Sequence, residues 1–201
     1  MHPSTDEISM AEVIDVLNEL TKGDAVIVTD VGQHQMVACR YAKFNQSKSN
    51  VTSGGLGTMG FALPAAMGAK FGAPERTVIA IAGDGGIQMT IQELGTIMQS
   101  KIDVKILILN NQFLGMVRQW QQLFNDKRYS FVNITSPDYV QVAKGYYIDG
   151  QSVSDRKDLK HALQTMLNHK GAYLLEVMVG KENNVFPMVP QGCSVAEIRL
   201  K

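Results

Sequence analysis

The sequence predicts an α/β fold, a doubly wound parallel sheet with helices on both faces, and three observations support this. Residues 77–82 and 104–109 are continuous apolar runs rich in Val and Ile, which is typical of parallel strands buried on both faces. Residues 87–100 between them are expected to form a helix, and such a strand–helix–strand unit is nearly always a right-handed crossover. Strands and helices also alternate along the rest of the chain, as they do in a sheet covered by helices on both faces.

The N-terminal part of the chain adds elements of the same alternating kind. Apolar residues at helical spacing predict a helix over residues 9–22, which Gly23 ends. A short apolar strand is expected at 25–29 and a helix at 33–41. The remaining elements before the central strands are a polar loop at 44–52 with a short strand near its end, and a helix of small residues at 60–71.

The C-terminal part continues this alternation and then becomes irregular. The expected elements are helices at 114–124 and 139–144, a short strand at 146–148, a helix at 156–168 that Gly171 ends, and a last strand at 172–179. Residues 181–201 contain Pro187 and Pro190 and are expected to form an irregular C-terminal extension. The chain is therefore divided into one domain, residues 1–180, and this extension.

Composition and length exclude several classes of function. The chain has 201 residues, the size of one α/β domain, and its 19 basic and 19 acidic residues balance, which argues against nucleic acid as a partner. No apolar run is long enough to span a membrane, and the N-terminus lacks the pattern of a signal peptide. Cys39 and Cys193 are expected to be free thiols, so the sequence predicts a cytoplasmic protein that does not bind a membrane.

Polar residues follow both central strands at the point where each is expected to end. Gly83-Asp84-Gly85 follows the first strand and Asn110-Asn111 the second. Since the carboxyl ends of parallel strands meet at one edge of a sheet, Asp84 and Asn111 are expected to bind Mg²⁺, which prefers carboxylate and amide oxygens. Gly85 and Gly86 leave bare N–H groups at the same place, so the sequence predicts a metal-bridged diphosphate site. The alternative is a simple turn at the end of each strand.

A second polar group is expected at the same edge of the sheet. The backbone of Val31 and Gly32 and the side chains of Gln33 and His34 follow the first strand and can hold diphosphate oxygens. The alternative reading of His34, a structural residue with its hydrogen bonds satisfied, stays open. Residues 55–60 formally match a dinucleotide-binding fingerprint, but no long apolar strand leads into them, so we reject this match.

These motifs resemble those of a known family. Gly-Asp-Gly followed one crossover later by Asn-Asn is similar to the diphosphate motif of thiamine-diphosphate enzymes. Residues 54–66 are similar to the family's pyrimidine-holding segment, and residues 31–36 and 111–121 to its acetolactate synthase (acetohydroxyacid synthase) branch. The resemblance runs from about residue 30 to residue 190 and is close over 54–129, which implies the C-terminal thiamine-diphosphate-binding domain of a catalytic subunit.

The resemblance implies which residues contact the cofactor. The carbonyl of Gly57 would accept a hydrogen bond from the aminopyrimidine, and Met59 would keep the cofactor bent, although the residue type alone favours core packing for Met59. The residues expected to bind thiamine diphosphate are Val31, Gly32, Gln33, His34, Gly57, Met59, Gly83, Gly85, Gly86, Leu114, Gly115, Met116 and Val117.

The resemblance also implies a metal shell and a substrate channel. Asp84, Asn111 and the backbone carbonyl of Phe113 would hold Mg²⁺, while Met116 and Trp120 would line the channel. From the residues alone, a single Trp on a helix is explained equally well by packing.

No catalytic residue is expected in this chain. By the resemblance, the glutamate that activates the cofactor belongs to a pyrimidine-binding domain, usually of a neighbouring subunit, and a middle domain binds FAD in most members. Neither domain fits into this length, so we expect one part of a longer enzyme that is inactive by itself. Glu93, an acid close to the diphosphate motif, is expected to be structural or solvated.

The implied function is the decarboxylation of pyruvate and its ligation to pyruvate or 2-oxobutyrate, in branched-chain amino-acid biosynthesis. The cofactors would be thiamine diphosphate and Mg²⁺, and the enzyme would be a homo-oligomer with a small regulatory subunit as a further partner. Two alternatives stay open. One is a stand-alone cofactor-binding subunit of a two-chain thiamine-diphosphate 2-oxo acid decarboxylase or oxidoreductase, and the other is a non-catalytic assembly module.

Overall fold

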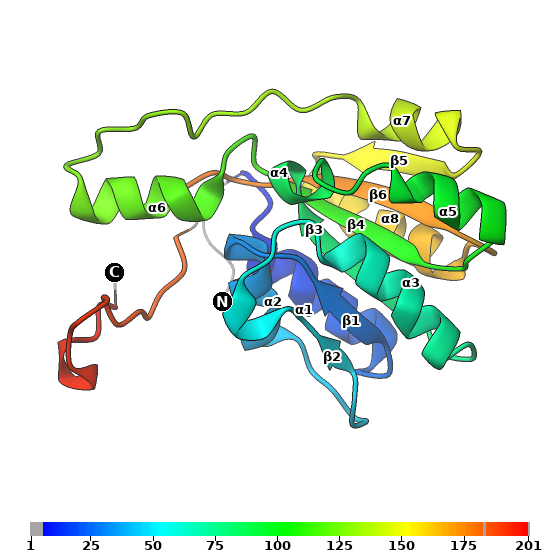
Figure 1. The fold of residues 1–201 in the computed structure, drawn as a ribbon, viewed down its shortest axis with the longest axis horizontal. Coiled ribbons are helices and arrows are strands. Elements are labelled where there is room, and N and C mark those ends of the chain that lie inside the picture. The colour runs from blue at the N-terminus through cyan, green and yellow to red at the C-terminus, as the bar shows by residue number, and fades with distance from the viewer. Residues whose placement is uncertain (1–5, 183, 201) are drawn as a thin grey trace.

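The structure, a computed structural model, describes residues 6–182 and 184–200. Within them, six strands form one all-parallel sheet in the order β2-β1-β3-β4-β6-β5 (Figure 1). The strands are β1 (Val26–Thr29), β2 (Asn50–Val51), β3 (Val78–Gly83), β4 (Lys105–Asn110), β5 (Asp149–Val153) and β6 (Tyr173–Met178). The chain runs from β1 outward to β2 and returns to β3 on the other side of β1, so the strand order switches between β1 and β3.

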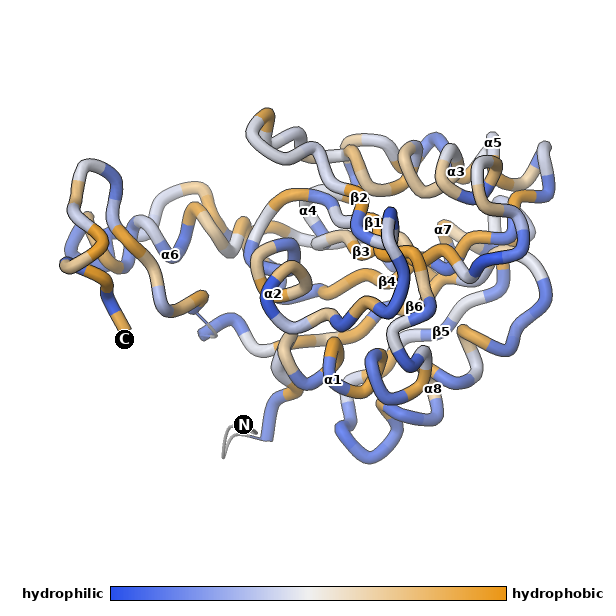
Figure 2. The backbone as a smooth tube through the Cα atoms, turned by 90° about the horizontal axis from the view of Figure 1, so that it is seen from below, coloured by the Kyte–Doolittle hydropathy of each residue, from blue (hydrophilic) through white to orange (hydrophobic). Residues whose placement is uncertain are grey.

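Helices cover both faces of this sheet, which confirms the predicted fold class. One face carries α1 (Met10–Thr21), α2 (Gln33–Tyr41) and α8 (Arg156–Asn168), and the other α3 (Ala62–Gly72), α5 (Glu93–Ser100) and α7 (Tyr139–Gly145). Figure 2 shows the apolar strands between these two layers. β3 and β4 are buried along their whole length because both of their faces meet a helix layer. None of the helices in the described ranges combines the length and apolarity that crossing a membrane requires.

The local sequence explains where α1 begins and ends. The N–H of Glu12 donates to Ser9 Oγ (3.1 Å), and the N–H of Ser9 donates to Glu12 Oε2 (3.5 Å), which together form a capping box. At the other end Lys22 and Gly23 take left-handed backbone conformations (φ 52° and 78°) that stop the helix. The helix predicted for residues 9–22 is confirmed.

The short strand predicted at residues 146–148 is wrong. Tyr146 follows the last turn of α7, Tyr147 has a left-handed backbone (φ 56°), and the strand is β5, further along the chain. β5 lies at the edge of the sheet, and its Asp149 and Ser152 are exposed. It therefore lacks the apolar run by which a buried strand is recognised.

The helix predicted at residues 87–100 is shorter than expected. Asp84–Ile87 form the single turn α4, residues 88–92 form turns, and α5 begins only at Glu93. The hydroxyl of Thr90 donates to the carbonyl of Gly60 (2.8 Å), 30 residues earlier in the chain. This tertiary contact ties the interrupted stretch to the segment before α3, and a helical sequence pattern cannot predict such a contact.

One helix, α6 (Gly115–Phe124), projects beyond the carboxyl edge of the sheet and lies on neither face (Figures 1 and 2). The C-terminal extension, described here for residues 181–182 and 184–200, packs against it. Arg118 on α6 donates to both oxygens of Glu182 (2.7 and 3.3 Å), and Asn184 Nδ2 donates to Gln122 Oε1 (3.1 Å). The extension is thus fastened to a helix of the preceding domain, whose boundary at residue 180 stays a prediction.

Candidate cofactor site

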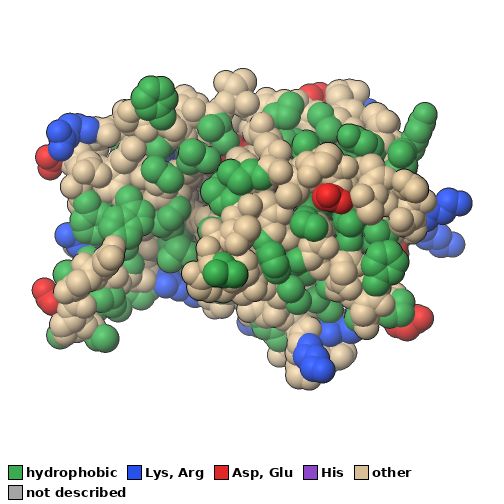
Figure 3. All heavy atoms as spheres, viewed as in Figure 1, with side chains coloured by type: hydrophobic (Ala, Val, Ile, Leu, Met, Phe, Trp, Pro, Cys, Tyr) green, Lys and Arg blue, Asp and Glu red, His purple; other side chains and the backbone are tan. Residues whose placement is uncertain are grey.

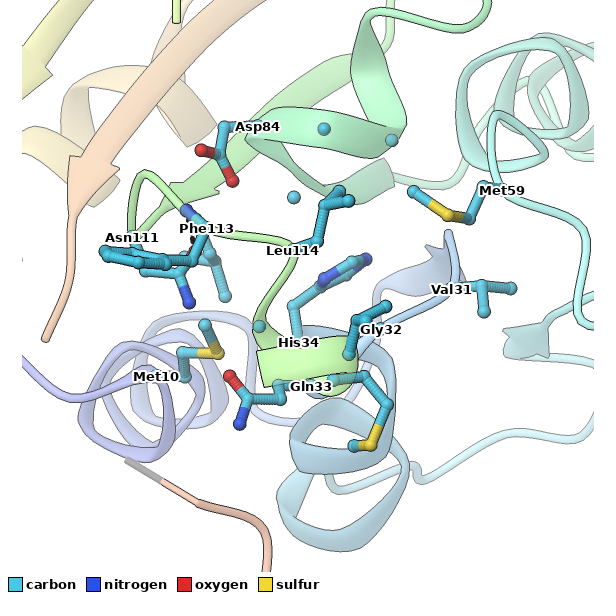
Figure 4. A pocket seen from close by; sticks show the side chains of 17 residues that line it. Met10, Val31, Gly32, Gln33, His34, Met59, Asp84, Asn111, Phe113 and Leu114 are labelled. Carbon is cyan, nitrogen blue, oxygen red and sulfur yellow. Dashed lines mark hydrogen bonds between the residues drawn. The ribbon is translucent and has the colours of Figure 1, made fainter. Parts of the chain in front are cut away.

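An open pocket lies at the carboxyl ends of β1, β3 and β4, beside the switch in strand order. Figure 4 shows Asp84 and Asn111 on one side of it, Met59 on the opposite side and His34 between them. The lining contains every residue predicted to contact the cofactor or the metal, with the exception of Gly57. The sequence motifs therefore do converge in space on one pocket.

Asp84 is the first residue of α4, and its side chain is buried at the end of β3. Ser136 Oγ donates to Asp84 Oδ2 (3.3 Å), and the hydroxyl of Tyr139 donates to the backbone carbonyl of Asp84 (2.6 Å). Burial raises the pKa of the Asp84 carboxyl to about 6. The carboxylate keeps lone pairs for a cation, and the charge of that cation would offset the cost of burial.

Asn111 lies in a tight loop that follows β4. Its Oδ1 accepts the N–H of Phe113 (3.1 Å), and Oδ1 of the preceding Asn110 accepts the N–H of Gln112 (2.9 Å). Asn110 Nδ2 in turn donates to Glu176 Oε1 on β6 (2.8 Å). Gln112 has a left-handed backbone (φ 59°), so these hydrogen bonds hold a strained loop that places Asn111 in the pocket lining.

His34 lies in the first turn of α2, between the glycines that follow β1 and end β3. A Cβ built on Gly32 or Gly83 would lie 2.9 or 3.0 Å from the imidazole ring, so a side chain at either position would crowd the ring, and Gly32 also has a positive φ (148°). The side chain is 5% exposed, and burial lowers its pKa to about 4, so the ring is neutral at pH 7. Its Nε2 has no hydrogen-bond partner among the described residues, which fits a nitrogen that binds a ligand.

Asp30, the residue after β1, connects the start of α3 with the turn after β3. Its Oδ1 accepts the N–H of Ala62 (3.4 Å), the first residue of α3. Its Oδ2 is buried without a partner in the described chain and lies so close to Gly86 that a Cβ there would overlap with it. Burial also raises the pKa of the Asp30 carboxyl. Gly85 is less constrained, because its Cβ would lie 2.8 Å from Leu114 Cδ2, the end of a side chain that can shift.

The segment predicted to hold the pyrimidine is the most exposed part of the region. Gly57 ends the 3₁₀ helix η1 (Gly54–Leu56) with a left-handed backbone (φ 59°) and lies outside the pocket lining. Met59 is half-buried and belongs to the lining. Leu56 beside them is 87% exposed, so this segment presents apolar surface to the outside.

The first turn of α6 forms the remaining wall of the pocket. Gly115, Met116 and Val117 belong to the lining. A Cβ on Gly115 would overlap with Gln33 Oε1 and would lie 2.8 Å from Asn111 Nδ2. Glycine at this position therefore lets α6 approach the loops after β1 and β4 closely.

Trp120 lies further along α6, outside the pocket lining. Its ring packs against that of Phe124 in a tilted arrangement, with 4.7 Å between ring centroids, and the residue is 38% exposed. Figure 3 shows hydrophobic side chains gathered over α6, where Val117 and Phe124 are exposed as well. The role of Trp120 in a substrate channel stays a prediction.

Sequence reasoning missed several residues of this region, among them Glu176, Asp30 and Met10. Glu176 supports the loop of Asn111, and a charged residue inside an otherwise apolar strand was the available signal. Asp30 directly precedes the polar segment after β1, a position that suggests a polar role. Met10 lines the pocket from the start of α1, and its apolar side chain carries no such signal. Glu93 is outside the lining and accepts the Thr96 hydroxyl (2.9 Å), which agrees with the structural role expected for it.

Known proteins with similar sequences include acetolactate synthases. The chain is 45% identical over 201 residues to the acetolactate synthase isozyme 2 large subunit of Escherichia coli (strain K12), covering 100% of this chain and 36% of that protein. It is 42% identical over 191 residues to the acetolactate synthase large subunit of Lactococcus lactis subsp. lactis (strain IL1403), covering 94% and 33%. It is also 42% identical over 201 residues to acetolactate synthase 1, chloroplastic, of Nicotiana tabacum, covering 96% and 30%. The chain spans about a third of the length of these relatives.

A family profile gives the same result at the level of the domain. The profile described as thiamine pyrophosphate enzyme, C-terminal TPP binding domain, matches residues 30–177. The match begins directly after β1 and ends within β6, and it includes the whole pocket lining apart from Met10. Since it covers well over half of the sequence, the chain belongs to the family of C-terminal TPP-binding domains of thiamine pyrophosphate enzymes.

Proposed function

We propose that the chain supplies the diphosphate and Mg²⁺ half of the active site of an acetolactate synthase catalytic subunit. The observation that carries this proposal is the convergence of Asp84, Asn111 and His34 on one pocket in a TPP-binding domain. Identities of 42% and 45% to acetolactate synthases favour this enzyme over the stand-alone subunit and the assembly module.

In this proposal Mg²⁺ takes three ligands from the chain: a carboxylate oxygen of Asp84, Oδ1 of Asn111 and the backbone carbonyl of Phe113. Carboxylate, amide and carbonyl oxygens are the hard ligands that Mg²⁺ prefers, and phosphate and water complete its octahedron. The raised pKa of Asp84 supports the fit, because a neighbouring cation stabilises the charged form of a buried carboxyl.

The diphosphate would lie against the glycine turns that surround His34. The N–H groups at the start of α4 have no partner within the helix, so Gly85 and Gly86 can donate to phosphate oxygens. The neutral His34 can donate from Nε2, and the lack of a protein partner for this atom supports that role. Val31, Gly32, Gln33 and Gly83 complete this side.

The apolar wall of the site would exclude water around the rest of the cofactor. Met59 and Leu114 face each other across Gly85, since a Cβ there would contact both side chains. Gly115, Met116 and Val117 continue the wall, with Gly57 contributing its carbonyl from outside the described pocket.

Thiamine diphosphate, when bound, supplies the electron sink for the decarboxylation of pyruvate. The residues of this chain bind the diphosphate and orient it, and none of them acts as the catalytic acid or base. The glutamate that activates the pyrimidine would come from a pyrimidine-binding domain of a neighbouring subunit, and FAD would bind to a further domain. The complete enzyme would ligate the product to pyruvate or 2-oxobutyrate, with Met116 and Trp120 along the substrate channel.

The proposal extends to the organisation of the protein. Residues 1–180 would be the cofactor-binding domain and residues 181–201 its extension, in a homo-oligomer with a small regulatory subunit. The two cysteines, Cys39 and Cys193, are exposed and unpaired in the described chain, which supports a reducing compartment, and we propose the cytoplasm.

Calorimetric titration of the chain with thiamine diphosphate, in MgCl₂ and again in EDTA, tests this function. We expect weak binding that requires Mg²⁺, because the chain supplies only part of the surface that would bury the cofactor. The chain alone should form no acetolactate from pyruvate. Binding of equal strength in EDTA would exclude a metal-bridged site, and no binding in MgCl₂ would contradict the proposed function.

A further inference from the structure

Two glutamines on α6 pair with backbone amides in the same way but in different segments. Gln119 Nε2 donates to the carbonyl of Val185 (3.2 Å), and the N–H of Val185 donates to Gln119 Oε1 (2.9 Å). Gln121 Nε2 donates to the carbonyl of Ser130 (3.1 Å), and the N–H of Ser130 donates to Gln121 Oε1 (3.0 Å). Gln119 is therefore bonded to the C-terminal extension, and Gln121 to the loop that follows α6.

Gln119 also reaches the lining of the pocket. Its Oε1 accepts a second hydrogen bond, from Nε2 of Gln33 in the first turn of α2 (2.9 Å). Gln119 is 1% exposed and Val185 is 3% exposed, so these bonds are shielded from water. Because each polar group involved would lie buried without a partner if a bond broke, the carboxamide fixes α2, α6 and the extension relative to one another.

The position of Gln33 depends on this contact. With Nε2 bonded to Gln119, Oε1 of Gln33 lies against Gly115, beside the amide of Asn111. Gln33 thus stands between the loop after β1, the loop after β4 and the start of α6. A shift of Gln33 would move the three segments that form most of the pocket.

We propose that Gln119 is a positioning residue through which the C-terminal extension holds the cofactor pocket in shape. Val185 fixes Gln119, and Gln119 fixes Gln33 between α2 and α6. The inference rests on the proposed function only in taking Gln33 as a residue that faces the cofactor. If this inference holds, cofactor binding depends on residues 184–188 as well. These residues lie outside the predicted domain of residues 1–180.

Hydrogen exchange of the complete chain tests this coupling without cofactor. Gln119→Met keeps the length of the side chain and removes the carboxamide. We expect roughly tenfold faster amide exchange both at residues 184–188 and at residues 33–36, because local opening becomes easier when the buried hydrogen bonds are lost. The amides of β4 should exchange as before. Gln121→Met, the matched control, should accelerate exchange only around Ser130.

Several outcomes would overturn the proposal. Unchanged exchange at 33–36 in Gln119→Met, or the same acceleration there in Gln121→Met, would remove the coupling. Faster exchange throughout the chain, β4 included, would show a role in global stability alone.

A second variant covers the case in which Gln119→Met does not fold. Gln119→Glu keeps the acceptor for Gln33 and for the N–H of Val185 but has no donor for the carbonyl of Val185. It should accelerate exchange at 184–188 and, to a smaller extent, at 33–36. No change at 33–36 would overturn the coupling in this variant too.

Titration with thiamine diphosphate and MgCl₂ adds the functional readout. We expect about tenfold weaker binding by Gln119→Met and unchanged binding by Gln121→Met, since loss of a supporting contact typically costs at least that much affinity. Equal affinity in Gln119→Met would overturn the positioning role. Absence of binding by the unsubstituted chain would refute the proposed function instead, while the exchange experiment would still decide the coupling.

Discussion

The two ends of the sheet both bury ionisable side chains, but they satisfy them differently. At the amino end, Lys105 on β4 is 4% exposed, and its Nζ donates to Asp103 Oδ1 (2.6 Å) and to the carbonyls of His169 (2.8 Å) and Gly171 (2.6 Å). An ammonium group has three hydrogens to donate, so this charge is fully satisfied by the protein.

The carboxyl end leaves polar atoms without partners. Thr29 Oγ1, Asp30 Oδ2 and His34 Nε2 are buried and make no hydrogen bond within the described residues, and they lie at the end of β1 and in the segment that follows it. A buried polar group without a partner costs stability unless a ligand supplies one. The fully paired Lys105 therefore has a structural role, whereas His34 Nε2, which belongs to a residue of the pocket lining, is available to a ligand.

The largest effect should follow from removing the charge at the carboxyl end. Asp84→Asn should weaken the Mg²⁺-dependent binding of thiamine diphosphate by about 100-fold or more, because the proposed metal shell would lose its only charged protein ligand. Calorimetry of the chain measures this. Asp15→Asn, at an exposed position on α1, is the control and should bind as the unsubstituted chain does. Unchanged affinity in Asp84→Asn would remove this residue from the site.

A substitution at the amino end of the sheet should change the stability of the fold but not the binding of thiamine diphosphate. Lys105→Met should lower the free energy of unfolding by about 3 kcal/mol, because two backbone carbonyls lose a charged hydrogen-bond donor. Urea denaturation measures this loss, and thiamine-diphosphate binding should be unchanged. Lys157→Met serves as the control, since its ion pair with Asp155 is largely exposed and should contribute little to stability. A loss of stability in Lys105→Met no larger than that in Lys157→Met would show that Lys105 is not a structural residue.

The pH dependence of the free energy of unfolding should reveal the contribution of His34, whose Nε2 has no hydrogen-bond partner in the described chain. Its folded pKa of about 4 lies below the ordinary 6.5, so the unfolded state takes up the proton more readily. The contribution of neutral His34 is fully present above pH 6.5 and is lost as the pH falls toward 4. Between pH 7.5 and 4.5, the unsubstituted chain should therefore lose about 2 to 3 kcal/mol relative to His34→Gln.

Asp84 changes the stability in the opposite direction as the pH falls. The pH profile of the unsubstituted chain must therefore be compared with that of His34→Gln. Its folded pKa of about 6 lies above 3.8, so without metal its charge destabilises the fold above pH 6, and this cost disappears as the pH falls. Because both chains in the comparison keep Asp84, its effect cancels. Parallel pH profiles of the two chains, measured by urea denaturation, would show that His34 is not buried in its neutral form.

The smallest effect should come from the support of the Asn111 loop. Glu176→Leu removes the acceptor for Asn110 Nδ2 and should weaken Mg²⁺-dependent binding by about tenfold, whereas Glu176→Gln keeps an acceptor oxygen and should bind nearly as before. Titration of both variants distinguishes a hydrogen bond from a charge effect. Equal losses in the two variants would show that the carboxylate charge matters and that the hydrogen bond to Asn110 does not.

The sequence predicted those parts of the site that depend on neighbours in the chain. Asp84 and Asn111 follow apolar runs long enough to be recognised as buried strands, and parallel strands bring their carboxyl ends together. The supporting contacts could not be predicted, since Glu176, Gln119 and Asp30 meet partners that lie 66, 86 and 32 residues away. β5 was misplaced for a related reason: its strand conformation depends on pairing with β6, because its own residues are mostly polar.

Because Asp30 approaches Gly86 closely, the substitutions that are tolerated at these two positions during evolution depend on one another. A side chain at position 86 would overlap with the Asp30 carboxylate in its present position, so Gly86 can be replaced only where that carboxylate shifts or position 30 has become smaller. The reverse order is open, because shortening Asp30 to Ala or Gly leaves Gly86 in place. Among relatives, a residue other than glycine at position 86 should therefore be accompanied by a smaller residue at position 30 or by a different orientation of the Asp30 carboxylate.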